Sequence, residues 1–172
     1  MKVEIVPPDP AWQEEFQKES RQLACVMEGN IVAIHHAGST AIPGIYAKPV
    51  IDFLIEVKSI TMTDEQNGAM TAIGYEAMGE FGLAGRRYFR KNRSPEVRTH
   101  DVHTYEVDSF EITRHLAFRD YMIAHLDDAQ QYSELKWQLA KQYAHDIEGY
   151  MDGKDKFVKM MEQKALLWRA MT

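Results

Sequence analysis

A glycine–serine turn between two short apolar runs constrains the fold of this chain more than any other feature. The first run, Ile31-Val32-Ala33-Ile34, is short and β-branched, which favours a strand. Gly38 and Ser39 follow it, and a longer apolar run then extends from Val50 to Val57. That second run is apolar enough to be a strand buried on both faces. The pattern therefore predicts two strands with a tight turn after the first.

The turn and the second run also carry groups with a shared chemistry. The backbone N–H groups of Gly38 and Ser39, with the serine hydroxyl, can hold a phosphate. Asp52, inside the second run, could hold the magnesium ion that accompanies a nucleoside triphosphate. Together they indicate a nucleotide site, which neither would alone. The alternatives are a plain strand-to-helix turn with a capping serine, and a buried acid satisfied by backbone N–H groups.

Composition excludes several other classes. The chain has 172 residues, enough for one domain or one domain with a helical appendage, and a net charge of −6 that argues against general nucleic-acid binding. Cys25 is the only cysteine, which excludes an internal disulfide and a cysteine-based zinc site. No apolar run approaches the roughly 18 residues of a membrane span. The N-terminus lacks a signal-peptide pattern, so we expect a cytoplasmic protein.

In the rest of the chain, the spacing of apolar residues first indicates both helices and a strand, and then helices alone. Apolar spacing predicts helices over about 10–28 and 64–73 and a third strand over 102–107. From about residue 115 onward, helical spacing predicts two or three helices. We therefore expect an α+β fold in which residues 1–114 form the core and residues 115–172 form a helical segment packed on it.

Basic residues provide further candidates for phosphate binding. Lys48 precedes a proline, so its backbone is extended, and its side chain could reach a substrate phosphate. Arg86 and Arg90 belong to the one basic cluster of the chain and would share a strand face, where they could clamp a triphosphate. The alternatives are an ordinary surface lysine and a solvated edge strand protected by its charges.

Two histidines and a threonine complete the candidate set. His36 adjoins the turn and could bond a phosphate or orient Ser39, whereas the alternative is a packed histidine. Thr40, within the turn, is a further candidate for phosphate binding. His103 on the third strand is open to the same two interpretations as His36.

Three sequence features together resemble the GrpB-like family of the nucleotidyltransferase fold superfamily. They are His36-Ala37-Gly38-Ser39-Thr40 with Pro43-Gly44 and Lys48-Pro49-Val50-Ile51-Asp52; His100-Asp101-Val102-His103; and Phe118-Arg119-Asp120-Tyr121 with Tyr132, Leu135-Lys136, Lys154 and Phe157. The resemblance implies a small mixed sheet flanked by helices. It further implies binding of a nucleoside triphosphate or another phosphorylated small molecule with magnesium or manganese, and nucleotidyl transfer to an unknown acceptor.

The chain departs from that superfamily pattern at one position. The pattern has two acids separated by one apolar residue, but Leu54 stands where the second acid would be. Glu56 shares the strand face yet lies about 13 Å from Asp52, too far to share one metal ion. Another strand could supply ligands, and His103 and Glu106 are candidates, although a spacing of three turns them to opposite faces. A non-catalytic phosphate-binding module and a structural domain serving a partner protein are therefore the alternatives to an enzyme.

Overall fold

A computed structural model describes residues 2–172, and the chain forms two compact units. The sheet unit consists of Pro10–Ala37 and Val50–Ile112. The helical unit consists of the N-terminal segment through Asp9, Gly38–Pro49 and Thr113–Thr172. The helical unit includes the residues from Thr113 onward, whereas the sequence set the helical segment at residues 115–172. It also takes in the turn segment that the sequence assigned to the sheet.

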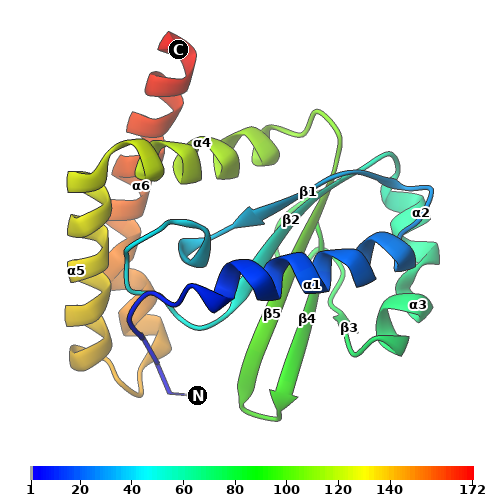
Figure 1. Cartoon of the computed structure of the whole chain (residues 1–172), viewed down its shortest axis with the longest axis horizontal. Helices are drawn as coiled ribbons and strands as arrows, with labels where there is room; N and C mark the ends of the chain where they lie inside the picture. The colour runs from blue at the N-terminus through cyan, green and yellow to red at the C-terminus, as the bar shows by residue number, and fades with distance from the viewer. Residues whose placement is uncertain (1) are drawn as a thin grey trace. The chain divides into compact units, whose positions relative to one another are not determined.

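The sheet has five strands in the order β1-β2-β5-β4-β3 (Figure 1). Their bounds are β1 Ile31–Ala37, β2 Ile51–Val57, β3 Glu76–Ala77, β4 Arg87–Ser94 and β5 Val97–Glu106. β2 and β5 are parallel, and the other neighbouring pairs are antiparallel. This mixed sheet, with helices following it, confirms the predicted α+β class.

One face of the sheet forms the apolar core of its unit. Alternate β2 residues, Ile51, Phe53, Ile55 and Val57, pack with Leu23 of α1 (Ala11–Val26) and with Met27, which follows that helix. α1 crosses this face in Figure 1. Each fully buried side chain of this kind contributes about 1.5–3 kcal/mol. The period of two places Asp52, Leu54 and Glu56 on the opposite face.

A short helical segment connects β2 to the edge of the sheet. The single helix predicted over 64–73 is instead two helices, α2 (Ile60–Glu65) and α3 (Asn67–Ala72), separated at Gln66. Ser59 caps α2 by accepting a hydrogen bond from the backbone N–H of Met62 at 3.1 Å. Gly74 has a φ of +99°, a conformation that ends the segment where the sequence placed its end.

The pairing of β4 with its neighbours rules out one interpretation of the basic cluster. β4 pairs with β5 along its length and with β3 at Phe89 and Arg90, so this part of the strand is internal. The alternative of a charged, solvated edge strand is therefore wrong for Arg90, because a two-residue strand occupies the edge. The sequence hides β3, since two residues are too few to show a period.

The helical unit contains three C-terminal helices and the turn segment. α4 spans Phe110–Ala124, α5 Leu126–Gln142 and α6 Ile147–Met171, and α5 and α6 lie side by side (Figure 1). Ile42 and Ile45 of the turn segment are almost completely buried in one cluster with residues of these helices. The apolar side chains of the turn segment thus explain its place in this unit. Within residues 2–172, none of the helices combines the length and apolar character that crossing a membrane requires.

Candidate active site

The face of the sheet opposite α1 carries a row of polar side chains from neighbouring strands. The parallel register pairs Asp52 of β2 with Asp101 of β5, and Leu54 with His103. Register partners on parallel strands project to the same side, so the two carboxylates and the imidazole lie on one face. Asp101 therefore supplies a second acid beside Asp52 from a different strand. Sequence reasoning missed this residue, although it lies in the His100-Asp101-Val102-His103 motif.

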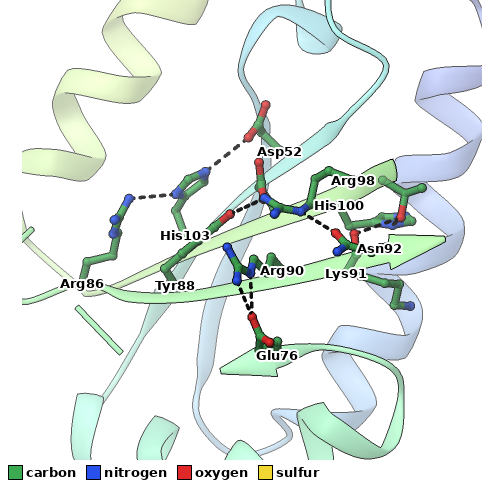
Figure 2. Close-up of polar contacts among 12 residues, drawn as sticks. Asp52, Glu76, Arg86, Tyr88, Arg90, Lys91, Asn92, Arg98, His100 and His103 are labelled. Atoms are coloured by element: carbon green, nitrogen blue, oxygen red, sulfur yellow. Dashed lines mark hydrogen bonds and ion pairs between the residues drawn. The ribbon is translucent and has the colours of Figure 1, made fainter. Parts of the chain in front are cut away.

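Asp52, His103 and Arg86 form a continuous polar chain on this face (Figure 2). Arg86 Nη1 lies 3.5 Å from His103 Nδ1, and His103 Nε2 lies 3.2 Å from Asp52 Oδ1. Because a guanidinium can only donate, this contact suits the tautomer in which Nδ1 accepts and the Nε2–H donates to the carboxylate. His103 is thereby fixed between a cation and an anion.

Arg86 is held by backbone as well as by histidine. Its Nη2 donates to the carbonyl of Phe81 at 2.9 Å and its Nε to the carbonyl of Glu80 at 3.2 Å. The guanidinium also lies 5.1 Å from the ring centroid of Tyr88. A buried arginine with these contacts has a fixed direction, and that direction is toward His103.

Asp101 is engaged by two donors beside Asp52. Tyr88 Oη donates to Asp101 Oδ1 at 2.5 Å, and Arg98 Nη1 lies 3.2 Å from the same oxygen (Figure 2). Burial raises the pKa of the Tyr88 hydroxyl well above its ordinary value, and the charge of Asp101 adds to the shift. Tyr88 also stacks on His103 with ring centroids 5.5 Å apart, which links the two polar groups.

The two arginines that the sequence paired make different contacts, although Arg90 is the register partner of Asp101. Arg90 Nη2 lies 2.7 Å from Glu76 Oε1, in an ion pair between β4 and β3. Glu76 is exposed and Arg90 is partly exposed, so this pair adds about 0–1 kcal/mol to stability. Of the two predicted phosphate-binding arginines, Arg86 is the one that contacts the Asp52–His103 pair.

Glu106, predicted with Asp52 as a metal ligand, lies elsewhere on β5. It pairs with Val57 at the other end of β2, and its Oε1 accepts a hydrogen bond from the backbone N–H of Ile60 at 3.0 Å. The structure therefore does not bring Glu106 to Asp52. Its carboxylate instead stabilises the first turn of α2.

The donor set of this face suits a metal ion delivered with its substrate better than a resident ion. Among residues 2–172, no three histidine, cysteine, aspartate or glutamate side chains are grouped to hold a metal ion. Magnesium that accompanies a nucleotide needs only one or two protein carboxylates, because phosphate and water supply the other oxygens. Asp52, with Asp101 as its register partner, fits that requirement.

His36 lies on the other face of the sheet. It pairs with Phe53, is 8 % exposed, and stacks on Phe16 of α1 with ring centroids 4.6 Å apart. The alternative of a packed histidine matches this position, and the structure does not bring His36 to Asp52 or His103.

The predicted phosphate turn belongs to the helical unit. Gly38 has φ +68° and ψ −172°, a combination open essentially to glycine alone, and Ser39–Ala41 form one 3-10 turn after it. Thr40 in this turn is buried. Lys48 Nζ lies 4.8 Å from the ring centroid of Tyr150 on α6. The backbone conformation at position 38 therefore requires glycine.

Known proteins resemble this chain over nearly its whole length. A family model described as GrpB protein matches residues 2–164. YqkA of Bacillus subtilis is 47 % identical over 168 residues, which cover 98 % of this chain and 48 % of YqkA. The chain therefore spans about half the length of that relative. The crystal structure of the conserved protein GrpB from Enterococcus faecalis is 44 % identical, with a TM-score of 0.92 over 96 % of this chain and 99 % of that one.

Two further likenesses are partial or weak. A dephospho-CoA kinase of Mycolicibacterium paratuberculosis is 38 % identical over 76 residues, which cover 42 % of this chain and 19 % of the kinase. The Cid1 poly(U) polymerase bound to Mg 3'-dATP has a TM-score of 0.49 and 12 % identity over 88 % of this chain and 49 % of that one. A likeness of the latter size carries no inference about activity.

Proposed function

This chain belongs to the GrpB family, and on that premise we propose that it binds a nucleoside triphosphate with a divalent metal ion and transfers the nucleotidyl group to an acceptor hydroxyl. The observation that supports this most is the pair of register partners Asp52 and Asp101 on one polar sheet face. Two acids beside each other on adjacent strands offer what the missing acid at position 54 would have offered.

In this proposal Asp52 is the carboxylate that holds magnesium or manganese. The metal ion would neutralise charge on the phosphates as pyrophosphate departs. Asp101 is the second acid of the same face, held in one orientation by Tyr88 and Arg98. Phosphoryl-group chemistry of this kind depends mainly on positioning and on charge stabilisation, so few protein groups are required.

His103 and Arg86 act here as positioning residues for Asp52. The Nε2–H of His103 donates to Asp52 Oδ1, and Arg86 keeps the ring in that tautomer through Nδ1. A carboxylate fixed in this way meets a metal–nucleotide without first losing rotamer freedom. Gly38, Ser39 and Thr40, with Lys48, remain the proposed phosphate-binding residues of the turn segment. The proposed setting is the cytoplasm, where a reduced cysteine and free nucleotides are expected.

Thermal unfolding with ligands tests the proposal. The purified chain is heated with ATP, GTP, CTP, UTP or dephospho-CoA, each with and without magnesium or manganese. A nucleotide at 100 times its dissociation constant should stabilise the fold by about 2.7 kcal/mol. We expect a shift that requires the metal and is lost in Asp52→Asn but kept in Asp127→Asn, an exposed acid of α5. The proposal would be overturned if none of the nucleotides gave a shift that depends on the metal.

A second candidate is a non-catalytic phosphate-binding module, favoured by Leu54. This residue is completely buried on the polar face of β2, where the superfamily pattern has an acid. A module would show a ligand-induced shift that is the same with and without metal and survives in Asp52→Asn. The same experiment therefore separates the two candidates.

A further inference from the structure

The helical unit contains a cavity of about 240 Å³ whose wall includes the first residue of the predicted phosphate turn. Gly38 lines it together with Arg114 and His115 of α4, Tyr132 of α5 and Lys154 of α6. None of the last four residues was assigned a role in binding from the sequence. Segments that are far apart in the chain thus bring a glycine turn and three basic side chains to one cavity.

The two acids that line the cavity are each neutralised by a basic partner. Glu162 Oε1 accepts a hydrogen bond from Arg114 Nη1 at 2.9 Å, and Asp155 Oδ2 lies 2.9 Å from Lys159 Nζ. The ion pair with Glu162 also fixes Arg114 between α4 and α6. The wall itself carries two cations, Arg114 and Lys154, against these two acids, so an excess of positive charge comes from the lysines around it.

Two further lysines, Lys48 and Lys136, place their ammonium groups over aromatic rings near this cavity. Lys48 Nζ and Lys154 Nζ lie 4.8 and 5.3 Å from the ring centroid of the same residue, Tyr150. Lys136 Nζ lies 4.3 Å from the ring centroid of Tyr132, and Lys136 is only 2 % exposed. Because ammonium groups are expensive to bury, such a concentration favours an anionic ligand.

Gly38 adds an open stretch of backbone to this positive wall. Without a Cβ, and with φ +68° and ψ −172°, it lets a ligand approach the main chain closely. Arginine binds phosphate through two parallel N–H groups, and lysine binds it as a point charge. The cavity is somewhat smaller than the roughly 300–1,000 Å³ of sites that enclose a whole ligand, so it suits one part of a nucleotide.

We propose that this cavity of the helical unit binds a polyphosphate group, with Lys154, Arg114 and His115 contacting phosphate oxygens beside Gly38. The identity of the ligand rests on the proposed function. The recognition of polyphosphate rests only on the charges and contacts of the helical unit.

The test uses inorganic tripolyphosphate, titrated calorimetrically into the full chain at low salt without metal. We expect Lys154→Gln to weaken binding by at least tenfold, because it removes a full charge from the wall, and Lys154→Arg to stay near wild type. The matched control is Lys164→Gln, since Lys164 is a half-exposed lysine of the same helix and does not line the cavity. Thermal unfolding of each variant establishes that it is folded.

The outcomes separate this inference from the proposed function. Absence of tripolyphosphate binding, or equal affinity in the two glutamine variants, would overturn the cavity as a polyphosphate site. If nucleotides still bound with metal and through Asp52, the proposed function would stand without the cavity. A third outcome is tripolyphosphate binding that depends on Lys154 and is unchanged in Asp52→Asn, with no metal-dependent binding of any nucleotide. This outcome would support the cavity as a polyphosphate site and reject nucleotidyl transfer.

Discussion

His103 is the register partner of Leu54, and its Nε2 lies 3.2 Å from Asp52 Oδ1. An imidazole therefore stands beside the strand position where a second acid is missing. It adds no negative charge to the face, but it fixes the direction of the acid that is present. The arrangement differs from a pair of acids on one strand, since orientation of Asp52 comes from β5.

Replacing His103 by alanine tests this positioning role. Removing a group that orients a ligating carboxylate typically weakens metal affinity by about 10–100-fold. We expect His103→Ala to weaken manganese-dependent nucleotide binding by that factor without abolishing it, whereas the exposed His145→Ala leaves it unchanged. Nucleotide titrations at fixed manganese measure the effect. An unchanged affinity in His103→Ala would show that Asp52 needs no such support.

His100 should make stability fall as the solution becomes acidic. Burial lowers the pKa of His100 below 6.5, against the opposing charge of Glu19. The unfolded chain then binds a proton that the folded chain resists, so the unfolding free energy decreases as pH falls below about 6.5. In His100→Gln this decrease should be smaller than in wild type, and in His145→Gln it should not. Urea unfolding at several pH values between 7.5 and 5.5 measures the slopes, and equal slopes in both variants would contradict the assignment.

Asn30 should be among the polar residues on which the sheet unit depends most. It is completely buried, donates to Thr63 Oγ1 at 2.9 Å and the carbonyl of Ser59 at 3.1 Å, and accepts from the N–H of Ser59 at 3.0 Å. Alanine would remove all three bonds and leave the half-buried N–H of Ser59 without its acceptor, which costs about 1–3 kcal/mol. Denaturant unfolding of Asn30→Ala should show this loss, while the exposed Asn92→Ala should change stability by about 0.5 kcal/mol or less. An equal loss of unfolding free energy in Asn30→Ala and Asn92→Ala would contradict this role of Asn30.

Two helical glycines should respond to alanine with opposite signs. At Gly149 a Cβ would lie 2.5 Å from Tyr143 Cδ1 and 2.7 Å from Asp146 Oδ2, so the ring and the capping carboxylate of α6 must move. We expect Gly149→Ala to lower the unfolding free energy by about 1–3 kcal/mol. At Gly68 a Cβ meets nothing within 4 Å, and alanine should raise the unfolding free energy by about 0.5–1 kcal/mol. Denaturant unfolding of both variants measures the two signs, and stabilisation by Gly149→Ala would contradict the packing.

Local patterns were enough to predict the α+β class, the first two strands and a turn at Gly38 and Ser39. These features depend on side-chain period and on backbone conformation, which neighbouring residues determine. The C-terminal helices followed from their long apolar period in the same way. β5 begins earlier than predicted, at Val97, because its first residues alternate polar side chains and show no apolar period.

The composition of the candidate site could not be predicted in this way. Asp101 becomes the neighbour of Asp52 only through the parallel pairing of β2 with β5, which no local pattern specifies. Gly38 lies in one cavity with Arg114 and Lys154 only through the packing of the turn segment with α4 and α6. Register and helix packing are properties of the folded chain, so a spacing rule that looked for two acids on one strand found Leu54 instead.

The division of the chain between its two units also fixes an order of assembly. On a ribosome, Ile42 and Ile45 emerge well before Ala117 and Met161, with which they share a cluster. The turn segment must therefore wait, unpacked, while the whole sheet unit through Ile112 is synthesised. A nascent chain halted after Gln142 would have every strand and the glycine turn, yet it would lack Lys154 and α6. The cavity is thus completed only once α6 has been made.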